Sequence, residues 1–289
     1  MIPKKSFKIN GLDKDETYLH LILTSACNYK CPYCVASEVD PYKGVLDSDC
    51  GKRELSKDDI DYIFDSIKID KVRVLIVGGE PLLSRNLNYL IDKLETNNHV
   101  NYIELLTNGS IPLNKVHLNK KLIMIFTYHP YKTNQKNLVK NLVYCTKNNI
   151  PLEFNVMLPQ DRSYPNIEKI LTVLKALNIP PLPIYPSIEF EEFNFVQKKY
   201  PFEDFRVFKI DDSDELLSFR DVCSQKLNRF KGWKCDNKLF IVDINKKVRQ
   251  CTGEILGDVK GFDFTNTERI CNLDSCVHEG FLRALKTKI

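Results

Sequence analysis

Apolar strand patterns alternate with amphipathic helix patterns between residues 17 and 190 of the chain. Apolar runs of this kind are typical of strands buried on both faces of a parallel sheet. Between them, apolar residues recur at helical spacing, and Ser56 with Asp59 predicts a capping box at the start of the first helix. Repeated β–α–β units predict an α/β fold, a partial (β/α)6 barrel of the TIM type. The strands we expect are Tyr18–Thr24, Val72–Val77, Tyr102–Leu106, Leu122–Thr127, Leu152–Met157 and Leu182–Tyr185.

Three closely spaced cysteines follow the first expected strand. Cys27, Cys31 and Cys34 have the spacing C-x3-C-x2-C. Soft thiolate ligands select iron–sulfur clusters, zinc or Cu(I), and a zinc or redox loop is the ordinary interpretation of clustered cysteines. A [4Fe–4S] cluster normally takes four cysteines, so three would leave one iron for a ligand that is not protein. Such an open position is typical of catalytic metal centres.

Two short motifs follow the next two expected strands. Gly-Gly-Glu-Pro comes after the second strand, and Thr-Asn-Gly comes after the third. Active sites of α/β barrels collect at the carboxyl ends of the strands, where both motifs and the cysteine loop are expected. Gly-Gly and Pro alone would mark no more than a turn. The residues are Gly78, Gly79, Glu80 and Pro81 in the first motif and Thr107, Asn108 and Gly109 in the second.

In this order the three motifs resemble those of radical S-adenosylmethionine (SAM) enzymes, whose cysteine loop carries an aromatic residue where Tyr33 stands. The resemblance implies that the three cysteines hold a [4Fe–4S] cluster and that SAM chelates the open iron. It also implies an external one-electron reductant of the flavodoxin or ferredoxin type. Reduction would cleave SAM to methionine and a 5′-deoxyadenosyl radical, which abstracts hydrogen from a substrate.

Further contacts to SAM are expected at two later strand ends. The resemblance implies a contact from Thr127, which ends the fourth strand. Asn155 interrupts an apolar strand, and a buried polar group needs a partner, so we expect it at the same cofactor. His129 is our candidate for proton transfer because His is the commonest general acid–base, and a structural role is the alternative. The expected SAM contacts are Tyr33, Gly78, Gly79, Glu80, Pro81, Thr107, Asn108, Thr127 and Asn155.

A second group of cysteines lies near the C-terminus. Two of them flank an expected hairpin in which Phe240–Asp243 pairs with Val248–Gln250. This pattern resembles the twitch and SPASM extensions of radical SAM enzymes and implies one auxiliary iron–sulfur cluster, of the [4Fe–4S] type. The family's hairpin glycine is replaced here by Asn245 or Lys246. A structural zinc site is the alternative, and Cys223 could replace one ligand. The expected ligands are Cys235, Cys251, Cys271 and Cys276.

The alternation of strands and helices stops near residue 190, where an acidic and aromatic stretch begins. We therefore expect two domains, a barrel over residues 1–200 and a small cysteine-rich domain over residues 201–289. Cys145 lies on the apolar stripe of its helix and is expected to be a small buried hydrophobe. Trp233 is likewise expected to pack rather than to bind a substrate.

Composition limits the classes of protein that remain. The chain is 43% apolar and 28% charged, which is ordinary for a soluble globular protein. A net charge of +4 without clustered Lys and Arg makes nucleic acid an unlikely partner. We see no membrane-spanning run and no secretory signal, and ten cysteines then indicate a reducing compartment. We expect a cytoplasmic protein.

The substrate is the least constrained part of the prediction. We expect a net oxidation, a dehydrogenation, of a small molecule, with an auxiliary cluster that takes the electron. The auxiliary cluster could instead ligate or position the substrate. The alternative is modification of a ribosomally made peptide. Only about 17 residues precede the first expected strand, which leaves no room for a peptide-recognition domain ahead of it. A more distant alternative is a non-catalytic zinc or iron–sulfur protein that binds nucleic acid in a salt-sensitive manner.

Overall fold

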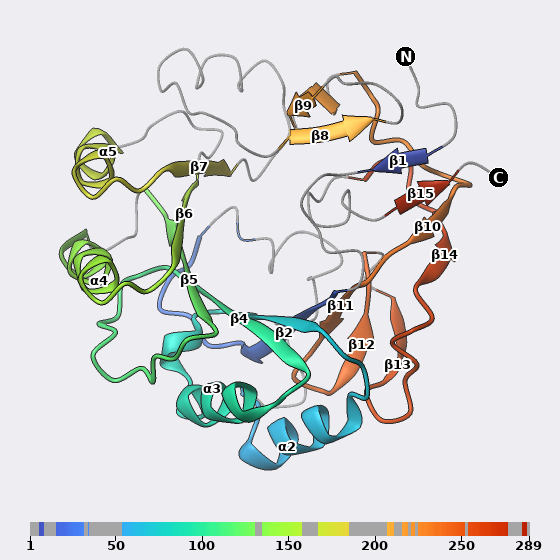
Figure 1. Ribbon diagram of the computed structural model, residues 1–289, viewed down its shortest axis with the longest axis horizontal. Helices are drawn as coiled ribbons and strands as arrows, with labels where there is room; N and C mark the ends of the chain where they lie inside the picture. The colour runs from blue at the N-terminus through green and yellow to red at the C-terminus, as the bar shows by residue number, and fades with distance from the viewer. Residues whose placement is uncertain are drawn as a thin grey trace.

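The computed structural model describes most of the chain (Figure 1). The described residues are 6–8, 16–31, 34, 54–130, 135–157, 167–184, 207–210, 216–218, 221–222, 225–251, 254–276 and 285–287. For residues 6–8, 183–184, 207–210, 216, 218 and 285 the backbone alone is described. Tyr33, Cys223 and the expected boundary near residue 200 lie outside these ranges, as does Tyr185 at the end of the sixth expected strand.

A nine-stranded sheet forms the larger part of the fold, in the order β13-β12-β11-β2-β3-β4-β5-β6-β7. Strands β2 to β7 pair with their neighbours in parallel register. They are the six strands that the apolar runs predict, within two residues at each end. Their bounds are Thr17–Thr24 for β2, Val72–Gly78 for β3, Val100–Thr107 for β4, Leu122–Tyr128 for β5, Leu152–Met157 for β6 and Pro181–Ile184 for β7.

The described helices α2 to α5 cover the outer face of the curved sheet (Figure 1). They are α2 (Lys57–Ser66), α3 (Leu87–Thr96), α4 (Gln135–Lys147) and α5 (Ile167–Ala176), and the short 3-10 helix η1 (Pro81–Leu83) follows β3. The capping box predicted for α2 is present, since the Ser56 side chain accepts from the Asp59 backbone and Asp59 accepts from the Ser56 backbone. The β–α alternation is thus confirmed.

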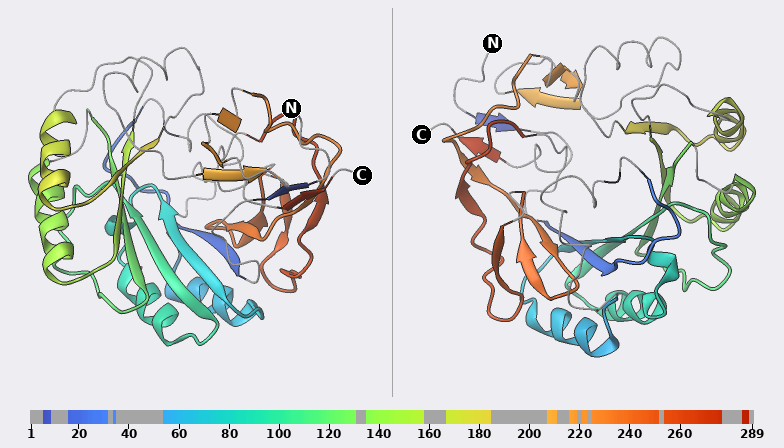
Figure 2. Two further views of the ribbon diagram at one scale, coloured as in Figure 1. Left: turned by 45° about the horizontal axis from the view of Figure 1, so that its top comes forward. Right: turned by 180° about the vertical axis from the view of Figure 1, so that it is seen from behind.

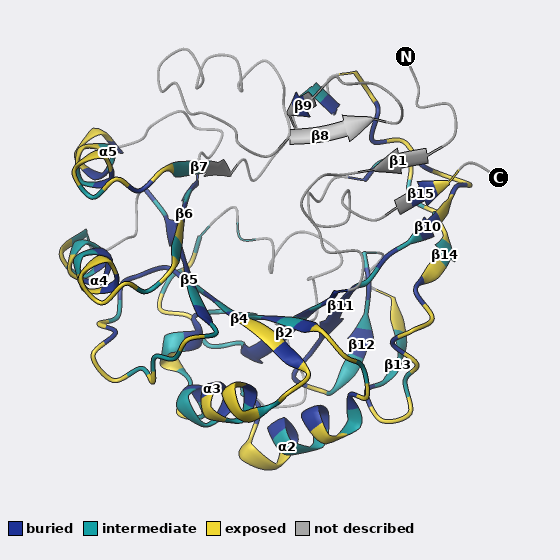
Figure 3. Cartoon of the chain, viewed as in Figure 1, coloured by how far each residue is buried: buried dark blue, intermediate teal, exposed yellow. Residues whose placement is uncertain are grey.

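Each helix buries one apolar stripe against the sheet, and its other face is exposed (Figure 3). On α3 the buried residues are Leu87, Leu90, Ile91 and Leu94. Burial of a side chain of this size contributes about 1.5–3 kcal/mol. Cys145 on α4 is fully buried, as expected of a small hydrophobe, and burial raises the pKa of its thiol to about 12.

The C-terminal hairpin extends this same sheet. Strands β11 (Leu239–Val242) and β12 (Lys247–Arg249) pair antiparallel, which confirms the predicted hairpin, and β13 (Ile255–Asp258) follows β12. β11 lies parallel beside β2. At the turn Lys246, rather than Asn245, has a positive φ of 63°. The Lys246 ammonium then donates to the Asp59 carboxylate at 2.8 Å and ties the turn to α2.

A second sheet of six antiparallel strands lies across the open side of the first (Figures 1 and 2). Its order is β14-β10-β15-β1-β8-β9. N-terminal β1 pairs with β15 near the C-terminus, so both ends of the chain meet in this sheet. The bounds are Ser6–Lys8 for β1, Val207–Ile210 for β8, Leu216–Ser218 for β9, Lys234–Asp236 for β10, Glu268–Ile270 for β14 and Leu285–Thr287 for β15.

Segments from both expected domains therefore share each sheet. The hairpin after residue 238 belongs to the barrel sheet, and the first strand of the chain belongs to the second sheet. The described helices include none that is long and apolar enough to cross a membrane. Trp233 is buried and packs edge to face on Phe230, with ring centroids 5.5 Å apart, as expected of a packing residue.

Candidate functional site

The cysteine loop begins at the carboxyl end of β2. Cys27 is exposed, and Cys31 and Cys34 are partly buried. The Cys34 backbone N–H donates to the Cys31 carbonyl at 3.1 Å and forms a turn that brings the last two cysteines together. The Tyr29 backbone N–H donates to the Cys27 sulfur at 3.3 Å, and a hydrogen bond of this kind strengthens when the sulfur ionises to bind a metal. The eight described cysteines are all thiols rather than disulfides.

The Gly-Gly-Glu segment lies directly against the start of this loop. The Gly79 N–H donates to the Thr24 carbonyl and the Glu80 N–H to the Ala26 carbonyl, both at 2.8 Å. A Cβ on Gly78 would lie 2.2 Å from the Thr24 carbonyl oxygen, and one on Gly79 would lie 2.3 Å from that of Ala26. The two glycines are therefore required for the approach of two backbones, which places the end of β3 beside the cysteine loop.

Glu80 joins this segment to the end of β4. Its side chain is 1% exposed and caps η1, where Pro81 occupies the first position. The carboxylate accepts from the Thr107 hydroxyl at 2.7 Å, the Asn108 backbone N–H at 2.8 Å and the Leu82 backbone N–H at 3.1 Å. Burial raises the pKa of Glu80, and these hydrogen bonds oppose that rise. Both predicted motifs thus meet through one carboxylate.

The Thr-Asn-Gly motif is also tied to the cysteine loop. The Asn108 side chain donates to the Asn28 side chain at 2.9 Å, and Asn28 donates to the Ser110 hydroxyl at 2.7 Å. Neither Asn28 nor Ser110 is among the site residues predicted from the sequence. No sequence signal identifies them, because their partners lie about 80 residues away in the chain.

Asn141 supports the same turn from α4, and it was also missed. Its side chain accepts from the Leu113 N–H and donates to the Gly109 carbonyl at 3.1 Å and the Ile111 carbonyl at 2.8 Å. Gly109 has a φ of 68°, which favours glycine. The sequence does carry a signal for Asn141, because this polar residue interrupts the apolar stripe of α4. The structure shows that Asn141 is buried, and a buried polar side chain needs hydrogen-bond partners.

The ends of β5 and β6 add three predicted site residues. Thr127 is buried and lies opposite Asn155 in the register between the two strands. His129 follows β5, and its Nδ1 lies 3.7 Å from the Cys31 sulfur. The Tyr29 ring contacts His129 edge on, with centroids 5.9 Å apart, and burial lowers the pKa of His129 to about 4. The structure therefore brings His129 to the cysteine loop.

The four C-terminal cysteines gather near the second sheet. Cys235 lies in β10 and is buried, as is Cys276, whereas Cys251 and Cys271 are partly buried. Burial, together with the neighbouring Cys235 and Cys271, raises the pKa of Cys251 to about 11. Burial, together with the other three cysteines, raises the pKa of Cys276 to about 12. All four are thus within electrostatic reach of one another.

Both cysteine groups offer thiols only, which suit an iron–sulfur cluster or zinc. Within the described ranges, no three His, Cys, Asp or Glu side chains are arranged to hold a single metal ion. A four-iron cluster takes one ligand on each iron and so holds its cysteines farther apart than one zinc ion does. The thiol donors of both groups fit a cluster by their chemistry.

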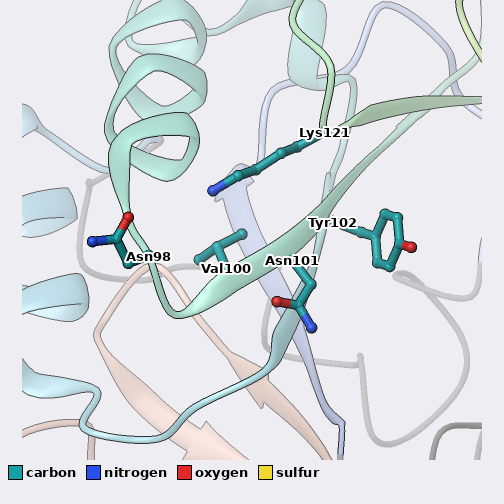
Figure 4. Close-up of a pocket in the computed structure, with 5 residues that line it drawn as sticks. All are labelled: Asn98, Val100, Asn101, Tyr102 and Lys121. Carbon is teal, nitrogen blue, oxygen red and sulfur yellow. The ribbon is translucent and has the colours of Figure 1, made fainter.

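A shallow pocket lies at the opposite end of the sheet (Figure 4). It is lined by Asn98, Val100, Asn101, Tyr102 and Lys121. Val100 begins β4, so this pocket is at the amino end of that strand, whereas the motifs lie at its carboxyl end. It is not part of the candidate site.

Comparison with known proteins matches the region that holds these motifs to one protein superfamily. Residues 21–143 match the radical SAM superfamily. The chain is 34% identical over 104 residues to a GTP 3′,8-cyclase of Desulforamulus reducens, which is 35% of this chain and 30% of that protein. It is 35% identical over 94 residues to a GTP 3′,8-cyclase of Staphylococcus epidermidis, covering 32% of this chain and 26% of that protein. The chain thus matches less than a third of the length of these relatives.

Solved structures share the fold over most of the chain. The anSMEcpe protein with bound AdoMet and a Cp18Cys peptide aligns with a TM-score of 0.53 at 13% identity, covering 85% of this chain and 78% of that one. Streptococcus suis SuiB bound to S-adenosylmethionine aligns with a TM-score of 0.54 at 14% identity, covering 81% and 59%.

The match covers part of the chain, and the fold agrees with it. Residues 21–143 match the radical SAM superfamily and lie within a TIM-like α/β fold. The matched residues contain the three-cysteine loop, both strand-end motifs, Thr127 and His129. The C-terminal cysteines lie outside the matched residues.

Proposed function

We propose that the protein is a radical SAM enzyme in which Cys27, Cys31 and Cys34 hold a [4Fe–4S] cluster whose fourth iron binds SAM. The observation that carries the proposal is the hydrogen-bonded junction of the three motifs, in which Glu80 accepts from Thr107 and Asn108 while its own N–H donates to Ala26 of the loop. When bound and reduced, the cluster would supply the one electron needed to cleave SAM to methionine and a 5′-deoxyadenosyl radical, which would take hydrogen from the substrate.

The chain's own residues would position SAM and exclude water. The backbone N–H groups of Gly79 and Glu80 fix the cysteine loop beside β3, and the Glu80 carboxylate holds the Thr-Asn-Gly turn beside the same segment. We assign SAM contacts to this edge, from Tyr33, Gly78, Gly79, Glu80, Pro81, Thr107, Asn108, Thr127 and Asn155. The buried position of Thr127 opposite Asn155 supports their inclusion.

Electron paramagnetic resonance (EPR) of the reduced protein tests the open iron. We expect the spectrum of the reconstituted wild-type protein to change when SAM is added. A variant that combines Cys27→Ala, Cys31→Ala and Cys34→Ala is expected to give a spectrum that SAM does not alter. A wild-type spectrum unaffected by SAM would contradict the proposal.

His129 is our candidate for proton transfer with the substrate, since it lies at the carboxyl end of β5. Its contact with Cys31 offers a rival role in support of the cluster. His129→Asn distinguishes the two roles. If His129 serves the substrate, the variant keeps its iron and still cleaves SAM without substrate. Loss of iron would contradict the assignment.

We further propose one auxiliary iron–sulfur cluster, of the [4Fe–4S] type, at Cys235, Cys251, Cys271 and Cys276. Support comes from the mutual electrostatic effect of these thiols and from their partial or complete burial. In the triple variant of the first cysteine loop, we expect iron and sulfide to remain at the second group. Zinc in their place would favour the structural alternative.

For the reaction we propose a net oxidation of a small molecule in the cytoplasm, with electrons from a flavodoxin or ferredoxin type of donor. Peptide modification is the second candidate, and anSMEcpe and SuiB, structures of the same fold with bound peptides, favour it. The name of the GTP 3′,8-cyclases denotes a cyclisation rather than an oxidation, and the match to the Desulforamulus reducens protein covers 35% of this chain and 30% of that protein.

Deuterium transfer discriminates between these substrate classes. Deuterated candidates are incubated with the reduced protein and SAM, and 5′-deoxyadenosine is analysed for deuterium. Transfer from a small alcohol or sugar with a two-electron oxidised product supports the first class. Transfer from a peptide, or a cyclised product, would contradict it. Salt-sensitive nucleic-acid binding without SAM cleavage would replace the enzyme proposal altogether.

A further inference from the structure

One lysine is buried at the second cysteine group. The Lys286 side chain is 1% exposed, although lysine is almost never fully buried unless its charge is paired. Removal of an ammonium group from water is strongly unfavourable without compensating negative charge. Its burial therefore indicates an anionic neighbourhood.

Strand pairing places this lysine directly beside the cysteines. Lys286 lies in β15 opposite Cys235 of β10 in the antiparallel register. Its ammonium lies 5.1 Å from the centroid of the Phe230 ring, a cation–π contact that fixes its position.

We propose that Lys286 is the buried counter-charge of a metal–thiolate centre formed by Cys235, Cys251, Cys271 and Cys276. This proposal rests on that part of the proposed function which assigns a metal centre to these cysteines. Lys286 acts through electrostatics and is a positioning residue rather than a ligand. It stabilises the thiolates that bind the metal, and it raises the reduction potential of an iron–sulfur cluster held there.

The direction of both effects follows from charge. Four thiolates carry more negative charge than a divalent metal ion or a cluster core neutralises, so the centre is anionic as a whole. One-electron reduction adds a further negative charge, and a nearby cation stabilises the reduced form. Salt screens a buried pair much less than a surface pair, so the effect persists at physiological ionic strength.

The chain offers a matched control for this charge. Lys234 lies in β10 next to Cys235, but its side chain is 45% exposed and pairs with Glu268 at 2.7 Å. Its charge is therefore largely screened by water. Lys234→Met removes one positive charge from the same strand without changing the buried one.

The first test is a redox titration of the auxiliary cluster, followed by EPR, in the triple variant that lacks the first three cysteines. With Lys286→Met we expect the reduction equilibrium constant to fall at least tenfold, which is about 59 mV for one electron. Lys286→Arg and Lys234→Met are expected to stay near the parent value. A Lys286→Met potential equal to that of the parent would overturn the proposal while the radical SAM assignment stands.

A second test uses Co²⁺ as the probe and does not depend on cluster assembly. The apo protein in the same background is titrated anaerobically, and the thiolate-to-cobalt absorption is measured in competition with a chelator. We expect at least tenfold weaker Co²⁺ binding in Lys286→Met and no change in Lys234→Met. Thermal unfolding checks that the Lys286→Met protein is folded. A Co²⁺ affinity of the folded variant equal to that of the parent would overturn the proposal. Absence of the thiolate-to-cobalt absorption band from the parent protein would also overturn it.

Discussion

The Asn108 side chain donates to the Asn28 side chain at 2.9 Å and so joins the end of β4 to the cysteine loop that follows β2. The Asn28 side chain in turn donates to the Ser110 hydroxyl at 2.7 Å. Two segments about 80 residues apart in the chain are thereby fixed at one edge of the sheet. The loop position is set by this contact as well as by the backbone of Gly79 and Glu80.

Asn28→Ala removes both hydrogen bonds of this connection. Each is worth about 1 kcal/mol, so we expect SAM affinity to fall by roughly 5 to 30-fold with little change in global stability. Isothermal titration of the reconstituted protein with SAM measures this. Asn88→Ala is the control, because Asn88 also makes two hydrogen bonds, to Lys115 and His117, but on the surface near α3. Equal effects of the two substitutions would contradict the assignment.

Gly79→Ala is expected to separate β3 from the cysteine loop. The new Cβ would lie 2.3 Å from the Ala26 carbonyl oxygen, so one backbone must move. Overpacking of this kind typically destabilises by about 1–3 kcal/mol, and the movement should also weaken SAM binding at least tenfold. Gly257→Ala is the comparison, since its nearest neighbour is a carbon of the Phe262 ring at 3.3 Å. SAM binding unchanged in Gly79→Ala would show that the close approach is not required.

Glu80→Gln tests whether the buried carboxylate holds the two motifs together. Both carboxylate oxygens accept hydrogen bonds, so a Gln amide must turn its NH₂ group toward the Asn108 N–H or toward the Thr107 hydroxyl and the Leu82 N–H. A buried donor left without an acceptor costs about 1–3 kcal/mol. We expect a lower thermal unfolding temperature together with weaker SAM binding. Wild-type values for both would contradict this role.

Arg73 stabilises the opposite end of the sheet, and its removal should affect stability rather than SAM binding. Its guanidinium donates to Glu16 at 3.0 Å and to Glu104 at 2.7 Å and lies over the Tyr102 ring at 4.5 Å. Arg73→Met leaves two carboxylates without their cation. We expect a loss of about 2–3 kcal/mol in the free energy of unfolding near pH 7, measured by urea denaturation.

This loss should shrink as the pH falls. Burial raises the pKa of Glu104, and Arg73 opposes that rise. Without Arg73, the folded protein binds a proton at Glu104 more readily than the unfolded chain does, so its relative stability increases as the pH falls through the raised pKa. Urea denaturation at about pH 7.5 and about pH 5 compares the two conditions. A loss that grows toward low pH would contradict this account.

Sequence patterns predicted the barrel sheet because each of its strands is an apolar run bounded by turns. The capping box at Ser56 and the buried thiol of Cys145 were predicted on equally local grounds. The second sheet was not predicted, since its strands are three or four residues long and β1 pairs with a strand at the other end of the chain. Strands this short carry little periodicity.

The motifs of the site could be read from the sequence, but their connections could not. Glu80 was expected at SAM, and the structure adds that its carboxylate accepts from two motif residues. The tie from Asn28 to Asn108 depends on two loops that meet only in the folded chain. Lys286 is one of many lysines in the sequence, and only its burial distinguishes it.

Formation of 5′-deoxyadenosine tests the central claim most directly. The protein is reconstituted anaerobically with iron and sulfide, reduced with dithionite and incubated with SAM, and the product is quantified by mass spectrometry. We predict 5′-deoxyadenosine from the wild-type protein and from Cys145→Ala, whose thiol is buried in α4 far from the loop in sequence, and none from Cys31→Ala. Intact SAM in wild-type protein that holds its full complement of iron would contradict the account.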